Sequence, residues 1–289
     1  MNGTELALQL LPPRCLDRQC REMLVGAEEL RLRIGQAPMI LKDGREYPMP
    51  VDPITDADLM RVLEKATGAS LHTAAPALAR GFISYHGLRI GVCGTAFERE
   101  GGILGFRNYS SISIRIPHEC KGICDELFHR LQMNPSENLL IVSPPGVGKT
   151  TALRELIRLY SEKGVRIGVV DERWEIAAFE MGRAQFDIGA HCDVLSGIPK
   201  AKASMMLLRT MNPQMIAMDE ITQPEDLHAI REIVGCGVVL LATAHAAGPA
   251  DLQRRALYRA LVDERLFRDF VQITMQNERR QYTLRRLEP

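Results

Sequence analysis

A short segment rich in glycine and proline carries the clearest chemical signal in the sequence. It reads Ser143-Pro-Pro-Gly-Val-Gly-Lys-Thr-Thr151 and lies between an apolar run and a helical pattern. A phosphate-binding loop requires this context, because its glycines let successive backbone N–H groups point at the phosphates. The positive end of the following helix adds to the attraction. A chance turn between a strand and a helix is the alternative interpretation.

Individual residues of this segment have distinct expected parts. Lys149 would reach the β- and γ-phosphates of ATP, and the Thr150 hydroxyl would bind Mg²⁺. The pattern departs from G-x-x-x-x-G-K-[ST] at its first position, where Ser143 replaces glycine. A serine fits there if its φ stays negative. The residues expected to hold the nucleotide are Ser143, Pro144, Pro145, Gly146, Val147, Gly148, Lys149, Thr150 and Thr151.

Two acidic pairs follow other apolar runs. Asp219 and Glu220 come directly after Met215-Ile-Ala-Met; Asp219 is expected to bind the magnesium ion and Glu220 to polarise the attacking water. Asp171 and Glu172 follow the run at 165–170. Ligands of parallel sheets bind beyond the carboxyl ends of the strands, so one of these two acids is expected to share the water-positioning role. A surface cluster of ion pairs is the alternative for this second pair.

The apolar run Val239-Leu-Leu-Ala is followed by Thr243-Ala-His245, so that polar side chains stand at its end. Its position at a strand end predicts that His245 lies near the γ-phosphate, which it would sense through a ring N–H. A structural histidine with no catalytic part is the alternative interpretation.

The elements that must position these residues follow from the pattern after residue 138. Apolar runs at 139–142, 165–170, 215–218 and 238–242 alternate with helical patterns, which predicts a parallel sheet with right-handed crossovers. The first 115 residues read as a mixture of strands and helices. The polar, proline-containing segment at 133–138 suggests a boundary. We therefore expect a smaller α+β N-terminal domain at 1–132 and, at 133–289, an α/β domain of the RecA-like P-loop NTPase type with a mostly parallel sheet.

Composition narrows the classes of partner. Lys plus Arg and Asp plus Glu both number 36 and aromatic residues make up 5%, which disfavours a nucleic-acid partner. The N-terminus lacks the features of a secretory leader, and the longest apolar stretch, 238–247, is shorter than a membrane span. A cytoplasmic protein is predicted, acting at a membrane only through a partner.

The seven cysteines form no C-x-x-C pair, so no disulfide framework or zinc site is predicted.

Three spaced motifs together resemble the stage III sporulation AA family. They are the segments 208–220, 171–177 and 242–245, with a further match at 193–200. Members of this family are ATPases of endospore-forming bacteria related to the motors of type II and type IV secretion. By this resemblance, Asp171-Glu172 matches an acidic box, Asp219-Glu220 the Walker B strand, and Thr243 with His245 a histidine box. Trp174 departs from the family pattern, which has a small polar residue there.

The resemblance implies more than the residues show by themselves. It implies a homo-oligomeric ring, expected to be a hexamer, with ATP and Mg²⁺ bound between subunits. It also implies a membrane-protein partner in the channel between mother cell and forespore, which the ATPase would power or assemble. An arginine from a neighbouring subunit would then act on the transferred phosphate, and Arg107, Arg115 and Arg209 are the candidates.

Two other functions fit the same motifs. A RecA-like or helicase-like ATPase acting on nucleic acid would use the same acids, and the arginine pairs 254–255, 279–280 and 285–286 favour it. Zero net charge and few aromatic residues disfavour it. The second alternative is a scaffold that ATP switches with little turnover. The presence of both Lys149 and Glu220 favours catalysis.

Overall fold

The computed structural model describes residues 3–99, 102–118, 120–131, 137–179, 182–276 and 279–286. The chain divides into two compact units, Met1–His118 and Glu119–Pro289. This division lies upstream of the predicted boundary at 132/133. Helix α5 (Asp125–Arg130) explains the difference, because Cys124, Leu127 and Phe128 are buried in the core of the second unit. The chain therefore joins the second unit before the polar segment that suggested the boundary.

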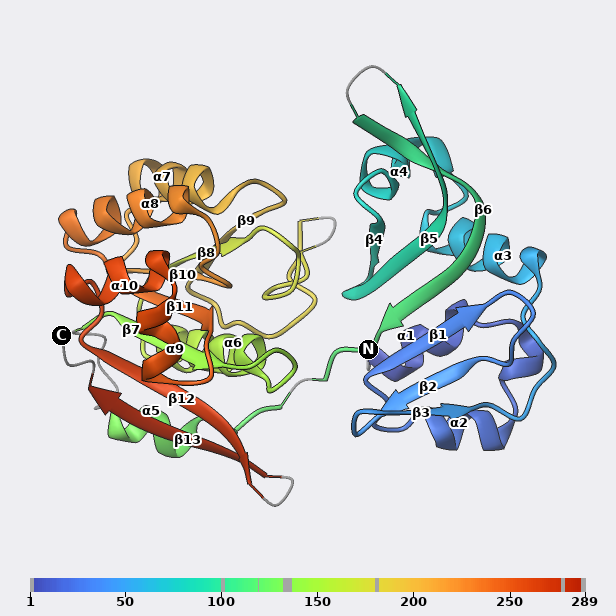
Figure 1. Ribbon diagram of the computed structural model, residues 1–289, viewed down its shortest axis with the longest axis horizontal. Helices are drawn as coiled ribbons and strands as arrows, with labels where there is room; N and C mark the ends of the chain where they lie inside the picture. Colours follow the sequence, from blue (N-terminus) through green and yellow to red (C-terminus); the bar gives the residue numbers. More distant parts are fainter. Residues whose placement is uncertain are drawn as a thin grey trace. The chain divides into compact units, whose positions relative to one another are not determined.

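The first unit is built on an antiparallel sheet. Within the described residues it has six strands in the order β3-β2-β1-β6-β5-β4. The strands are β1 (Glu29–Arg33), β2 (Met39–Lys42), β3 (Arg45–Pro48), β4 (Phe82–Tyr85), β5 (Leu88–Arg99) and β6 (Gly102–Arg115). The long β5–β6 hairpin extends beyond the other strands (Figure 1). Leu30 and Leu32 are buried while Arg31 between them is not, which is the alternation of a half-buried strand.

Helices complete the core of this unit. They are α1 (Gly3–Leu10), the short 3₁₀ helix η1 (Pro13–Cys15), α2 (Arg18–Leu24), α3 (Asp56–Ala66) and α4 (Leu71–Leu78). A capping box starts α3, with Thr55 and Asp58 each bonding to the other's backbone N–H. Asp58 also accepts two hydrogen bonds from Arg14, at 2.8 and 2.5 Å. This ion pair connects η1 to the beginning of α3.

The second unit holds a mostly parallel sheet, which confirms the predicted α/β class. Its order is β13-β12-β7-β11-β10-β8-β9. Among the described strands of this sheet, only β13 pairs in the antiparallel direction, with β12. The strands are β7 (Leu139–Ser143), β8 (Ile167–Asp171), β9 (Cys192–Ser196), β10 (Met215–Met218), β11 (Val239–His245), β12 (Asp269–Gln276) and β13 (Arg279–Arg286). The β12–β13 hairpin lies along one edge of this sheet (Figure 1).

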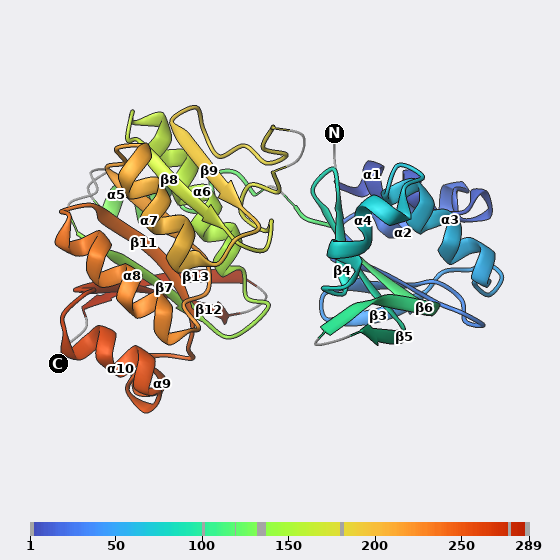
Figure 2. The same ribbon diagram turned by 90° about the horizontal axis from the view of Figure 1, so that it is seen from above.

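Helices cover both faces of the sheet. The helices are α5, α6 (Lys149–Glu162), α7 (Lys200–Thr210), α8 (Pro224–Gly235), α9 (Pro249–Arg254) and α10 (Ala256–Asp263). Leu139 and Ile141 pack in the core with α6 and α5, whereas Leu140 and Val142 pack in the core of α7, α8, α9 and α10. The continuous apolar runs of the sequence reflect this burial on two sides. Helices α7 and α8 lie side by side (Figure 2). Among the described residues, no helix combines the length and apolar character needed to span a bilayer.

The strand order brings the predicted site residues together. Strand β11 lies between β7, which leads into the loop at 143–149, and β10, which leads into Asp219. Parallel strands place their carboxyl ends at one edge of the sheet. The ends of β7, β8, β10 and β11 therefore meet where the sequence predicts chemistry.

Candidate active site

The loop between β7 and α6 has the backbone of an anion cradle. Gly146 and Gly148 have φ values of 76° and 107°, in the left-handed region that favours glycine. Ser143 keeps a negative φ, which meets the condition for a serine at that position. Its side chain is buried and donates to Pro144 O at 2.9 Å. The departure from the usual motif therefore leaves the loop geometry intact.

Lys149 carries a positive charge into the centre of this loop. The residue is 5% exposed, and its Nζ donates to Ser143 O at 2.9 Å and Pro144 O at 3.0 Å. Desolvation lowers the pKa of Lys149, although the charges of Asp219 and Glu220 oppose the shift. Among the described residues, no carboxylate bonds directly to this ammonium group. A buried cation held only by neutral atoms fits a phosphate as its ligand.

Thr150 and Asp219, the two residues predicted to hold Mg²⁺, are in direct contact. Thr150 Oγ1 donates to Asp219 Oδ2 at 2.6 Å, so the first residues of α6 and the end of β10 are in contact. Thr243 on β11 donates its hydroxyl to the other Asp219 oxygen and accepts the Glu220 backbone N–H at 2.8 Å. A hydroxyl beside a carboxylate is the ligand pair that P-loop enzymes use for Mg²⁺. Thr243 thus orients both acids from the intervening strand.

Glu220 lies at the centre of a second set of contacts. Its carboxylate is 2.6 Å from His245 Nε2 and 2.5 Å from Arg173 Nη1. Burial disfavours its charge, but the bond from His245 and the charges of Arg173 and Lys149 prevail and lower the pKa of Glu220. Its φ of 51° lies in the left-handed region, which a residue other than glycine rarely adopts. A hollow of about 10 Å³ between Glu220 and the turn at 171–175 is close to the smallest space that holds a water.

Asp171 and Glu172 have different partners. Asp171 is 2% exposed and accepts the backbone N–H groups of residues 175, 176 and 177 at 2.7 to 3.0 Å. Burial raises the pKa of Asp171, and these backbone bonds oppose the shift. Glu172 pairs with Lys200 Nζ at 2.8 Å. Asp171 therefore anchors a turn, and Glu172 fits the ion-pair alternative; a catalytic part for either remains a prediction.

The structure also reveals residues to which the sequence assigned no role. Arg173 contacts Glu220, as described above. Arg154 on α6 donates to the carbonyls of Glu175 at 2.6 Å and Ile176 at 2.8 Å, and lies 3.9 Å from the centre of the Phe186 ring. It joins the helix that follows the loop to the turn that Asp171 anchors. The signal available in the sequence was its position one helical turn after Thr150.

The three candidate trans-acting arginines occupy different places. Arg107 and Arg115 lie on β6 of the first unit, with the Arg107 guanidinium 4.8 Å from the centre of the Phe97 ring. Arg209 is exposed on α7 of the second unit. Action of any of them on a neighbouring subunit remains a prediction.

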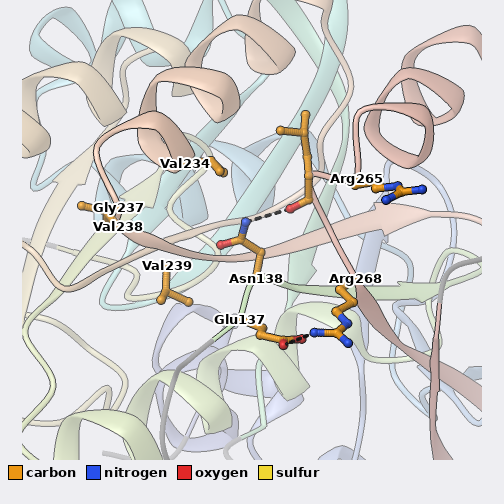
Figure 3. Close-up of a pocket in the computed structure, with 9 residues that line it drawn as sticks. Glu137, Asn138, Val234, Gly237, Val238, Val239, Arg265 and Arg268 are labelled. Carbon is orange, nitrogen blue, oxygen red and sulfur yellow. Dashed lines mark hydrogen bonds and ion pairs between the residues drawn. The ribbon is translucent and has the colours of Figure 1, made fainter.

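A separate hollow of about 350 Å³ lies at the amino ends of strands β7 and β11, opposite the carboxyl ends where the candidate active site lies. Figure 3 shows Asn138 at its centre, with the Arg268–Glu137 ion pair beside it. The Asn138 amide donates to Leu266 O at 2.7 Å and accepts Leu240 N–H at 2.8 Å, which ties three segments together. Because Asn138 directly precedes β7 while the loop follows it, this hollow is distinct from the candidate active site.

Comparison with known proteins adds independent findings. Residues 13–285 match a protein family that is described as "Sporulation stage III, protein AA". Stage III sporulation protein AA of Bacillus subtilis (strain 168) is 35% identical over 254 residues, which cover 86% of this chain and 82% of the relative. These matches agree with the resemblance that the spaced motifs indicated.

Two solved structures share the fold. The Legionella pneumophila ATPase DotB aligns with a TM-score of 0.59 and 16% identity, over 95% of this chain and 81% of DotB. The pilus retraction motor PilT, solved with bound ADP, aligns with a TM-score of 0.63 and 16% identity, over 91% of this chain and 80% of PilT. The family match over residues 13–285 and the identity to the Bacillus protein show that this chain belongs to the stage III sporulation protein AA family.

Proposed function

We propose that this protein is an ATPase that binds and hydrolyses Mg-ATP as a homo-oligomer. The proposal rests on a set of contacts at the carboxyl ends of the strands. Lys149 in its loop contacts His245, which contacts Glu220. The neighbouring Thr150 contacts Asp219. A cation, a metal-ligand pair and a carboxylate meet within hydrogen-bond distances. The shared fold with DotB and PilT supports the same chemistry.

The proposed roles follow from the chemical groups. Thr150 and Asp219 would hold Mg²⁺, which neutralises charge on the phosphates. Lys149 would exchange its contacts with Ser143 O and Pro144 O for phosphate oxygens. Glu220, kept ionised by its lowered pKa, would accept a hydrogen bond from the attacking water and orient it. His245 would remain hydrogen-bonded to that carboxylate.

The biological setting is proposed from the relatives. The name of the family supports a role in endospore formation. PilT is named a retraction motor, which supports mechanical work coupled to ATP. We propose that this chain acts in the cytoplasm as a ring, with a hexamer as the expected size. Its partner would be a membrane protein of the channel between mother cell and forespore, which it would power or assemble.

Titration calorimetry with Mg-ATP and with a non-hydrolysable analogue tests the proposal. Wild type is expected to bind both. Lys149→Ala is expected to lose roughly tenfold or more in affinity, since a charge-assisted bond is removed. Glu220→Gln is expected to bind normally and to lose about 10²- to 10⁴-fold in turnover, whereas the exposed control Glu225→Gln stays at the wild-type rate. Absence of binding by folded wild type would overturn the proposal.

Measurements of size and partner specificity separate the remaining alternatives. Light scattering with and without the analogue is expected to show nucleotide-dependent assembly, and a persistent monomer would contradict the ring. Single-stranded DNA is expected to leave the ATPase rate unchanged. Strong stimulation by DNA would favour the nucleic-acid alternative, and tight binding with negligible turnover would favour the scaffold.

A further inference from the structure

An arginine from the end of the chain lies against the phosphate-binding loop. Arg280, on β13, donates from Nε to Val147 O at 2.9 Å. Its guanidinium lies directly over Gly148, where an added Cβ would come within 2.8 Å of Nε. More than 130 residues separate the two segments in sequence. The β12–β13 hairpin beside β7 brings them together.

The remaining donors of Arg280 are available. The side chain is exposed, and within the described residues only its Nε–H has a hydrogen-bond partner. The planar fork of a guanidinium cation matches phosphate oxygens. A second cation therefore stands beside a loop that already contains Lys149.

The two sides of the loop differ in charge. On the side of β11 and β10 lie Asp219, Glu220 and His245, which define the end where the metal and the attacking water belong. On the other side of β7 lie β12 and β13, which present Arg280. A triphosphate whose terminal group faces the acids must extend its inner phosphates away from them. Arg280 is placed to meet that part of the chain of phosphates.

We propose that Arg280 is a phosphate-binding residue of the site, which contacts the inner phosphates of the nucleotide on the side of the loop away from Glu220. This inference rests on the proposed function. It predicts that ATP and ADP depend on Arg280 to the same degree, because both carry the inner phosphates. The alternative is that Arg280 only supports the loop through Val147 O.

Four variants of the full-length chain separate these roles by calorimetry with Mg-ADP and Mg-bound non-hydrolysable ATP. Arg280→Ala is expected to weaken both by roughly 10- to 100-fold. Arg280→Lys, which keeps the charge but loses the planar fork, is expected to retain part of the affinity and to bind more tightly than Arg280→Ala. Arg280→Gln, which keeps a donor for Val147 O without the charge, is expected to bind as weakly as Arg280→Ala. The matched control Arg285→Ala removes an exposed arginine from the other end of β13 and is expected to bind like wild type.

The outcomes are distinct. Unchanged affinity in Arg280→Ala overturns the inference and leaves the proposed function intact. Recovery in Arg280→Gln but not in Arg280→Lys also overturns it, because the loop contact alone would then account for the effect. Failure of wild type to bind either nucleotide overturns the proposed function, and this inference with it. Equal thermal melting temperatures of the variants establish that each is folded.

Discussion

The amino group of Lys149 lies 2.9 Å from Nδ1 of His245, so that a loop lysine and a strand-end histidine are in direct contact. The other ring nitrogen is 2.6 Å from Glu220. A protonated Lys149 donates a hydrogen bond to Nδ1. The ring hydrogen therefore lies on Nε2, which donates a hydrogen bond to the Glu220 carboxylate. One imidazole thus connects the group proposed to bind phosphate with the group proposed to orient water.

This connection predicts that His245 acts mainly on turnover. His245→Asn is expected to lower kcat by roughly 10- to 100-fold, because Glu220 loses the donor that orients it, with a small change in nucleotide affinity. His245→Gln, whose amide reaches about as far as Nε2, is expected to retain more activity. Steady-state kinetics and calorimetry together check both statements. Equal activity of wild type and His245→Asn would return the residue to a structural role.

Arg173 is predicted to influence the pH dependence of catalysis through Glu220. Its guanidinium helps to lower the pKa of that carboxylate, so removing it lets the pKa rise. In Arg173→Gln, Glu220 would take up its proton at a higher pH, and the acid limb of the kcat profile is expected to shift upward. The control Arg268→Gln removes an exposed arginine that pairs with Glu137. An identical profile in Arg173→Gln and wild type would contradict the role.

Arg154 is predicted to stabilise the second unit. Arg154→Met keeps the apolar stem but leaves two carbonyls, those of Glu175 and Ile176, without their donor. The expected loss is about 2–4 kcal/mol in the free energy of unfolding. Trp174 is the only tryptophan of the chain, so urea unfolding followed by its fluorescence reports on this unit. The exposed control Lys163→Met is expected to change stability by less than about 0.5 kcal/mol.

The Arg14–Asp58 ion pair is predicted to make the first unit sensitive to acid. The hydrogen bonds from Arg14 hold the pKa of Asp58 well below its usual range. A lowered folded-state pKa contributes stability above the unfolded value of about 4, and that contribution is lost as the pH falls toward the folded value. Asp58→Ala is therefore expected to lower the free energy of unfolding by about 2–4 kcal/mol at pH 7, because it removes a helix cap and the carboxylate that pairs with Arg14. The deficit relative to wild type should shrink in acid.

Circular dichroism of urea unfolding at several pH values measures this difference. Asp56→Ala removes a neighbouring exposed carboxylate that makes no cap, and it is the matched control. A deficit in Asp58→Ala that stays constant from pH 7 to pH 3 would show that the ion pair is not responsible.

Local patterns predicted what local interactions determine. The run at 139–142 and the loop after it indicated a buried strand and a phosphate cradle, and β7 and α6 flank that loop as expected. The contact between Thr150 and Asp219 followed from strand ends that share one edge. Each of these inferences needed only hydrophobic periodicity and the chemistry of a turn.

Contacts that depend on strand order lay beyond such patterns. Nothing in the sequence near Arg280 indicated that β13 would lie beside the loop, because the order of β12 and β7 is a property of the whole sheet. The same holds for Arg173, which reaches Glu220 from the end of a strand on the other side of β10. The expected boundary at 132/133 followed polarity, whereas the burial of Leu127 and Phe128 sets the observed division.

The attachment of α5 to the second unit has a mechanical consequence. The Gly122 backbone N–H donates to Glu155 at 2.6 Å, and Lys121 pairs with Asp187 at 2.5 Å. Glu155 belongs to α6, the helix that begins with Lys149. A pull on the chain at Gly122 would therefore act on α6 at Glu155, and this helix begins at the loop that contains Lys149.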